Sequence, residues 1–148
     1  MTVVGYDESL GSKTYKTVSG VVAYTDPKTG RTLHLIIHQA IHVPHLDHHL
    51  LCPMQCRVND VIIDETPKFL ASQPTDQTHA LTVADPHDPS RTLTMPFSLR
   101  GVTSLLYVRN VAADDFYNTD TPRIDLTSES LTWDPTTTLY EEQWRKGC

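Results

Sequence analysis

The residues with the clearest chemical potential are histidines and cysteines gathered in one short stretch. Six of the eight histidines in this 148-residue chain, and two of its three cysteines, lie within 23 residues. They are His34, His38, His42, His45, His48, His49, Cys52 and Cys56. Imidazole and thiolate groups are preferred zinc ligands, and four in a tetrahedral array can hold a small fold together. One hypothesis is therefore a zinc site whose ligands come from His42, His45, His48, His49, Cys52 and Cys56.

The spacing of these residues favours a second interpretation without a metal. It matches no zinc motif with a fixed ligand spacing. Exposed histidines on one strand face, loop histidines and small apolar cysteines would give the same pattern. Within a helical segment, Cys52 and Cys56 would lie one turn apart, which is poor geometry for a redox disulfide. His48 or His49 beside a cysteine nucleophile would need a third, orienting group, and the sequence indicates none.

The other patterns in the sequence do not indicate a catalytic or cofactor-binding site. The sequence has no Gly-rich phosphate loop with its lysine, no His-Glu-x-x-His and no Gly-x-Ser-x-Gly. The pairs Asp114–Asp115 and Glu141–Glu142 are typical of solvated surface charge. Trp133 and Trp144 lie in polar sequence, where a tryptophan typically anchors a segment by covering apolar surface. We therefore assign no catalytic, cofactor-binding or metal residue, and keep the zinc site as the alternative.

The elements that would position the histidines are predicted to be strands. Tyr15–Tyr24 and Arg31–Val43 are rich in Val, Thr, Ile and Leu, and Asp26–Gly30 separates them. Pro27 suits the second position of a type I turn, and Gly30 suits the left-handed residue that follows it in a bulged hairpin. The first half of the chain therefore predicts a β-hairpin.

Alternation in the second strand predicts one buried face. Leu33, Leu35 and Ile37 would share the face on the core, whereas Thr32, His34 and His38 would share the opposite face. Pro44 ends the run because proline cannot donate to a strand ladder.

The remaining sequence predicts short elements and a polar end. The expected elements are a helical turn at Pro53–Arg57, a strand or tight hairpin at Val58–Ile63, a hairpin of Thr78–Val83 with Arg91–Phe97, a strand at Val102–Val108 and a helical turn at Val111–Phe116. The expected fold is mainly β, with a β core in 1–70, an additional hairpin region in 71–116 and a polar, extended or disordered tail in 117–148.

Composition excludes several classes of protein. Twelve Lys and Arg against eighteen Asp and Glu give a formal net charge of −6, which argues against a broad basic surface for nucleic acid. No run of about twenty apolar residues predicts a membrane span, and the first residues do not resemble a signal peptide. Three cysteines do not form a disulfide framework. These features favour an intracellular, cytoplasmic location.

Several segments together resemble the aspartic-protease region of copia-type retrotransposon polyproteins. They are Val18–Ala23, the hairpin Asp26–Gly30, the run Leu33–Leu46 and the run His49–Cys52. The family has a Gly-containing strand, a hairpin, a Val-Pro-Gly-Leu-like segment and an Asn-Leu-Leu-Ser-like segment. His45 stands here where the family has Gly, and Cys52 where it has Ser. The runs Leu50–Leu70 and Pro122–Glu142 also resemble retroelement polyproteins of algae, oomycetes and fungi.

The resemblance implies a retropepsin-like fold and an aspartic endopeptidase ancestry. Proteases of this family use Asp-Ser-Gly or Asp-Thr-Gly, with one aspartate from each subunit of a dimer sharing a proton. This sequence has neither motif, and Asp7 is followed by Glu8-Ser9 without the glycine. The motif precedes the hairpin in the family, so this chain is expected to begin after it and to lack the first strands.

The resulting expectation is a protease-like fragment of a retrotransposon polyprotein that is catalytically incompetent alone. An uncovered sheet edge would favour a homodimer, or pairing with an upstream polyprotein segment. The alternative is a small intracellular β-domain that binds a metal through the His/Cys group, or a protein partner.

Overall fold

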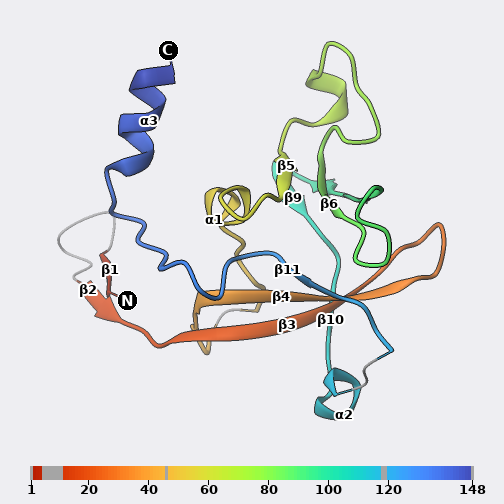
Figure 1. The fold of residues 1–148 in the computed structure, drawn as a ribbon, viewed down its shortest axis with the longest axis horizontal. Coiled ribbons are helices and arrows are strands. Elements are labelled where there is room, and N and C mark those ends of the chain that lie inside the picture. Colours follow the sequence, from red (N-terminus) through yellow and green to blue (C-terminus); the bar gives the residue numbers. More distant parts are fainter. Residues whose placement is uncertain (1, 5–11, 46, 118–119, 148) are drawn as a thin grey trace.

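A computed structural model describes residues 2–4, 12–45, 47–117 and 120–147. The tripeptide Asp7-Glu8-Ser9, Leu46 and Cys148, which enter the sequence argument, lie outside these residues. The described part is mainly β, as expected, and its strands form several separate sheets, none of them closed into a barrel. Figure 1 shows one long hairpin running the length of the molecule, with the shorter elements projecting from it.

The predicted hairpin is confirmed as strands β3 (Thr17–Thr25) and β4 (Thr32–Ile41). The Gly30 N–H donates to the Asp26 carbonyl at 2.8 Å, and the Asp26 N–H donates to the Arg31 carbonyl at 2.8 Å. Gly30 has a φ of 74°, the left-handed conformation that the bulged turn requires and that glycine adopts without steric cost. Local turn chemistry therefore sets the register of this hairpin.

Two short strands extend the hairpin into a four-stranded sheet in the order β10-β3-β4-β11. β10 (Arg109–Asn110) pairs antiparallel with β3, opposite Ala23 and Val22. β11 (Arg123–Asp125) pairs parallel with β4, with Ile124 opposite Leu35. The segment expected to be a polar tail therefore supplies a strand next to the most buried part of β4.

A second sheet, in the order β5-β6-β7, is built from the middle of the chain. Its strands are β5 (Ile62–Asp64), β6 (Ala80–Ala84) and β7 (Thr92–Pro96), so the predicted second hairpin is confirmed. Two-stranded pairs are formed by β1 (Thr2–Val4) with β2 (Ser12–Thr14), and by β8 (Ser98–Arg100) with β9 (Thr103–Leu105).

The helical elements are short. They are α1 (Pro53–Arg57), the 3-10 turn η2 (Lys68–Leu70), α2 (Ala113–Phe116) and α3 (Leu139–Gly147). The helical turn predicted at 53–57 is confirmed. No helix among the described residues is long and apolar enough to cross a membrane.

Helix α3 corrects the prediction that the chain is extended throughout its polar end. The Glu142 N–H donates to the Thr138 carbonyl at 3.0 Å, and the Thr138 hydroxyl donates to the Glu142 carboxylate at 3.2 Å. Glu141 and Arg145 form an ion pair at 3.7 Å, one helical turn apart. Acidic residues in the first turn and basic residues in the last complement the helix dipole. This distribution of charge is typical of a helix and would have indicated α3 from the sequence.

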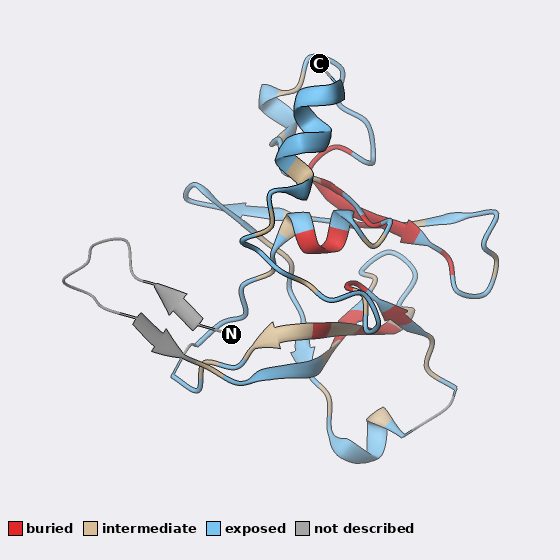
Figure 2. Ribbon diagram, turned by 60° about the vertical axis from the view of Figure 1, so that its left-hand side comes forward, coloured by how far each residue is buried: buried red, intermediate tan, exposed pale blue. Residues whose placement is uncertain are grey.

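One hydrophobic core joins the two larger sheets and α1. Figure 2 shows buried residues concentrated on β4, on the β5-β6-β7 sheet and on α1. The cluster consists of Tyr24, Leu33, Leu35, Cys56, Val61, Ile63, Leu81, Val83, Met95, Ile124 and Leu126. Because members come from positions 24 to 126, folding of the hairpin sheet and of the second sheet is energetically coupled through shared apolar burial.

The prediction of an exposed histidine face on β4 is wrong. His34 is 3 % exposed and His38 is 8 % exposed, so both faces of β4 are covered at these positions. Alternation identified the apolar face correctly, since Leu33 and Leu35 are almost fully buried. It did not identify β10 and β11, which flank the hairpin and come from the last third of the chain.

Candidate functional site

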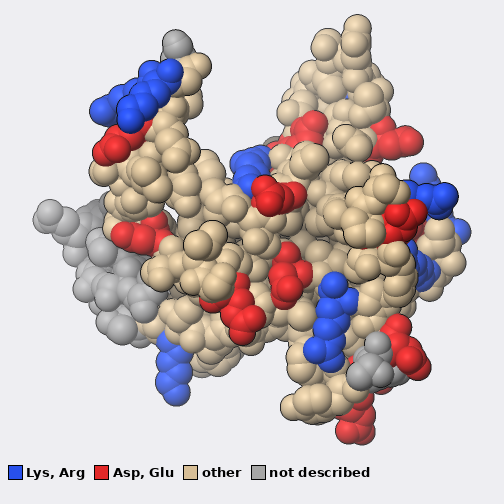
Figure 3. All heavy atoms as spheres, in the orientation of Figure 1, with Lys and Arg blue, Asp and Glu red and all other residues tan. Residues whose placement is uncertain are grey.

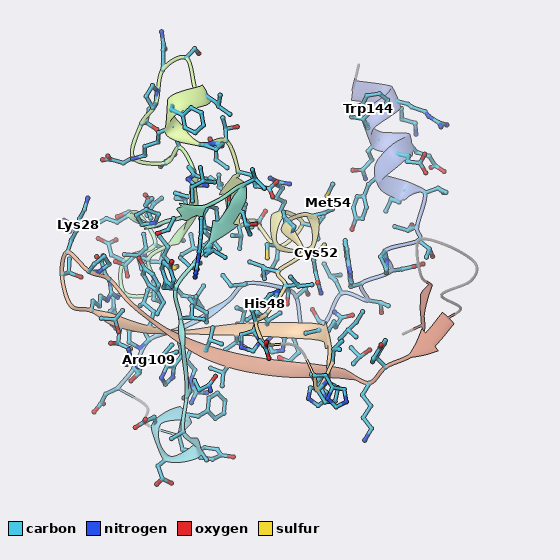
Figure 4. The ribbon with its side chains drawn as sticks, turned by 180° about the vertical axis from the view of Figure 1, so that it is seen from behind. Lys28, His48, Cys52, Met54, Arg109 and Trp144 are labelled. Atoms are coloured by element: carbon cyan, nitrogen blue, oxygen red, sulfur yellow. The ribbon has the colours of Figure 1, made fainter. Side chains whose placement is uncertain are left out.

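The six residues of the hypothetical zinc site are spread over a loop and a helix. His42, His45, His48, His49 and Cys52 are exposed, whereas Cys56 is completely buried. Figure 4 shows His48 in the loop that follows β4 and Cys52 at the start of α1. Among the described residues, no three His, Cys, Asp or Glu side chains are placed to hold one metal ion. The structure therefore gives the zinc hypothesis no geometric support.

The two described cysteines are free thiols in different environments. Cys56 is a member of the core, and burial raises its pKa to about 12, with the neighbouring Cys52 adding to the shift. Since the thiolate is the reactive form, Cys56 is chemically inert in the folded chain. Cys52 begins α1, and its carbonyl accepts a hydrogen bond from the Cys56 N–H at 3.3 Å. The pair thus lies one helical turn apart, as predicted.

The structure instead assembles a Ser–His–Asp array centred on His38. The Ser19 hydroxyl lies 2.9 Å from His38 Nδ1, and Asp125 Oδ1 lies 2.8 Å from His38 Nε2. Ser19 lies on β3, His38 on β4 and Asp125 on β11, so three neighbouring strands each contribute one residue. This is the order of groups that activates a serine in many hydrolases.

Hydrogen-bond chemistry assigns the tautomer of His38. An ionised carboxylate only accepts, so the His38 nitrogen facing Asp125, Nε2, carries the hydrogen. In the neutral ring, Nδ1 is then the acceptor, and the Ser19 hydroxyl donates to it. The Ser19 oxygen is thereby polarised toward a base that is itself oriented by an acid.

The backbone of His38 is fixed on both sides by a buried threonine. The His38 N–H donates to the Thr127 hydroxyl at 2.7 Å, and that hydroxyl donates to the His38 carbonyl at 2.8 Å. The Gln55 amide adds a donor to the same carbonyl at 3.2 Å. Thr127 is fully buried, so these bonds are shielded from water. Thr127 and Gln55 therefore position His38 on a rigid frame.

Ser19 is exposed where the sheet is irregular. The β3–β4 register shifts between Val18 and Gly20, so that two residues of β4, His38 and Gln39, lie opposite Ser19 in a β-bulge. Bulges bend a strand and redirect a side chain, and they are over-represented beside active sites.

A second buried histidine, His34, faces a cavity of about 260 Å³ whose lining also includes Arg109, Asn110 and Asp115. Its Nδ1 is buried without a hydrogen-bond partner. Burial lowers the pKa of His34 below 6.5, and the positive charges of Arg123 and Arg109 lower it further against the opposing effect of Asp115. The lowered pKa favours the neutral form of the His34 imidazole. A smaller cavity of about 100 Å³ lies beside Tyr24, Leu93 and Met95.

The two acidic pairs lie at helix starts, and the two tryptophans differ in their contacts. Asp114–Asp115 lie in the first turn of α2, and Glu141–Glu142 in the first turn of α3, where they complement the helix dipoles. The Trp133 ring lies 6.2 Å from that of Tyr140, whereas Trp144 is 71 % exposed. Figure 3 shows acidic and basic side chains interspersed on the face it presents, without a broad basic surface there.

Sequence reasoning included His38 only as a member of the His/Cys group, and it missed Ser19 and Asp125 as its partners. Ser19 is 19 positions from His38, and Asp125 is 87 positions from it. No local motif links the three residues. The parallel pairing of β11 with β4 brings Asp125 to His38, and no local sequence pattern predicts that pairing.

Comparisons with known proteins do not assign this chain to a family. No family model matches it, and no curated protein or solved structure gives a significant match.

Proposed function

We propose that this chain is the protease-like segment of a copia-type retroelement polyprotein, with a retropepsin-like arrangement of its hairpin sheet. Support comes from the sequence segments that resemble the family, Val18–Ala23 and Leu33–Leu46, the described parts of which lie on β3, on β4 and in the loop after β4. The short helix α1 begins directly after His49–Cys52, the segment that resembles the family's Asn-Leu-Leu-Ser element.

The proposed segment does not cleave peptides by aspartic-protease chemistry on its own. That chemistry needs two carboxylates that share a proton and activate a water. The 148 residues contain neither Asp-Ser-Gly nor Asp-Thr-Gly, the motifs that supply these carboxylates in the family. The aspartates would therefore come from another part of the polyprotein, and this segment would supply sheet structure.

The single observation that carries the proposal is the open outer edge of β3. β10 covers only Val22 and Ala23, and no other strand among the described residues pairs along that edge. The uncovered part, Thr17–Val21, is largely exposed, and Val18 is 36 % exposed. A strand edge with unpaired N–H and C=O groups is a template for another chain.

A second copy of this chain is the proposed occupant of that edge. Proteases of the resembled family act as dimers, and two copies of Thr17–Val21 can pair antiparallel around a two-fold axis. Such pairing uses backbone hydrogen bonds and therefore needs no special side chains on either strand. The segment would thus contribute to assembly of the polyprotein.

Size-exclusion chromatography with light scattering, over a range of protein concentrations, tests this assembly. We expect a concentration-dependent dimer for the native chain. Val18→Lys should raise the dimer dissociation constant at least about ten-fold, because a lysine on an edge strand opposes pairing. The matched control is Val102→Lys, since Val102 is 99 % exposed on the turn between β8 and β9. A chain that stays monomeric at high concentration, or that responds equally to both variants, would contradict the proposed edge.

A further inference from the structure

The Ser19–His38–Asp125 array has the geometry of a nucleophile, a general base and an orienting acid. Both hydrogen bonds of the array have ordinary lengths, 2.9 Å and 2.8 Å. From this we infer that Ser19 is an activated nucleophile that accepts acyl groups from small carboxylic esters. This inference needs no aspartic-protease chemistry. Ser19 lies within Thr17–Val21, the edge proposed to pair with a second copy, but that pairing uses backbone groups, whereas the serine acts through its side chain.

The division of roles follows from exposure. The His38 side chain is 10 % exposed, so the base is held in place and largely shielded from water. The Asp125 side chain is 62 % exposed, so its hydrogen bond with His38 is screened by water and adds little stability. Asp125 therefore acts chiefly by keeping the hydrogen on Nε2, and its backbone is anchored by the Asn59 amide at 2.9 Å.

The array differs from the familiar triad in one respect. Here the serine faces Nδ1 and the acid faces Nε2, whereas the usual triad has the reverse assignment. Either ring nitrogen accepts a proton when the other one carries the hydrogen. A general base requires hydrogen-bond reach to the proton it removes, and the 2.9 Å separation meets that requirement.

The chemical steps balance without any further reagent. The Ser19 oxygen attacks the ester carbonyl carbon while its proton moves to His38 Nδ1, and the alcohol leaves with that proton. Water then attacks the acyl-serine, giving its proton to the same nitrogen. Breakdown of the resulting tetrahedral intermediate returns the proton to the Ser19 oxygen and releases the carboxylic acid. One ester and one water are thus converted into one acid and one alcohol.

The surroundings limit the substrate class to small, activated esters. Neither of the two cavities described above is lined by these three residues, and Ser19 is exposed, so the substrate is one small enough to reach the hydroxyl from solvent. An activated ester has a good leaving group, so acylation of Ser19 is expected to be faster than hydrolysis of the acyl-serine.

The test is covalent labelling of the full chain with a fluorophosphonate probe, followed by peptide mass spectrometry. Phosphonylation joins the Ser19 oxygen to phosphorus, releases fluoride and passes the serine proton to His38. We expect labelling on the Ser19 peptide, none in Ser19→Ala, and at least about ten-fold slower labelling in Asp125→Asn. Ser19 and the Asp125 side chain are exposed, so neither change removes core packing, and circular dichroism verifies the fold.

The chain contains a matched control for this experiment. The Ser104 hydroxyl lies 2.7 Å from His79 Nε2, and no carboxylate partner of His79 occurs among the described residues. Ser104→Ala should label at the native rate. Absence of labelling at Ser19, equal labelling of Ser104, or an unchanged rate in Asp125→Asn would each overturn the inference. The release of 4-nitrophenol from 4-nitrophenyl acetate, compared between native chain and Ser19→Ala, gives an independent readout of acylation.

Discussion

Arg31 and Asp85 form a bidentate ion pair across 54 positions of sequence. Arg31 Nη1 and Nη2 donate to the two carboxylate oxygens of Asp85 at 3.0 and 3.1 Å. Arg31 directly precedes β4 and Asp85 directly follows β6, so the pair links the hairpin sheet to the second sheet. Fork-to-fork geometry of this kind is the strongest form of side-chain ion pair.

This ion pair predicts a loss of stability in acid. The hydrogen bonds from Arg31, followed by that from the His87 N–H, lower the pKa of Asp85 from 3.8 to about 2. Because the folded-state pKa lies below the unfolded one, the contribution is complete above about pH 5 and is lost as pH falls toward 2. Urea unfolding at a series of pH values should show this loss. Asp85→Asn should lower the free energy of unfolding at neutral pH. It should also weaken the dependence of that free energy on pH between pH 4 and 2.

The matched control for this pair is Asp88→Asn. Asp88 and Arg91 form an exposed ion pair at 3.3 Å, only three residues apart. Exposed pairs contribute little, so this variant should keep the native acid profile. An acid profile of Asp85→Asn identical to that of the native chain would contradict the assigned role of the Arg31–Asp85 pair.

Because the two larger sheets share one hydrophobic core, we expect them to unfold in a single transition. Leu35 on β4 is 1 % exposed and Leu81 on β6 is 0 % exposed. Leu35→Ala and Leu81→Ala should each lower the free energy of unfolding by about 2–5 kcal/mol, because each leaves a cavity in the core. Val102→Ala, at an exposed turn, should change it by less than about 0.5 kcal/mol. Separate unfolding transitions for the two sheets in either leucine variant would show that the core is not shared.

The cysteines predict selective alkylation. Cys52 is exposed and should react with iodoacetamide in the folded chain, whereas Cys56 should react only after unfolding, because burial raises its pKa to about 12. Peptide mass spectrometry distinguishes the two sites. Added zinc should leave the rate at Cys52 unchanged. Protection of Cys52 by stoichiometric zinc would instead support the metal site that the sequence suggested.

The Gln39 side chain is hydrogen-bonded to the backbone between Ser128 and Trp133, and we expect these bonds to stabilise that segment. Its amide donates to the Ser128 and Leu131 carbonyls at 2.8 and 2.6 Å, and its oxygen accepts from the Trp133 N–H at 2.7 Å. Gln39→Ala should speed hydrogen exchange at the Trp133 amide about five-fold or more, since one such bond contributes about 1 kcal/mol. Gln77→Ala, at an exposed glutamine, should not change it. Equal exchange in both variants would contradict this role.

Local chemistry explains which elements could be predicted. The β3–β4 hairpin was predictable because Pro27 and Gly30 determine its turn, and α1 because Pro53 begins it. The burial of His38 was not, because it depends on β11 and on Thr127 far along the chain. The Ser19–His38–Asp125 array was hidden for the same reason, since its residues meet only after the parallel pairing of β11 with β4.

We have proposed that this chain is a protease-like segment without aspartic-protease activity of its own. The most direct measurement is a peptide-cleavage assay at about pH 5, with and without pepstatin, on this chain and on a version extended upstream in its genome. We expect no cleavage by the 148-residue chain and pepstatin-sensitive cleavage by the extended one. Pepstatin-sensitive cleavage by the 148-residue chain, or no cleavage by either version, would contradict it.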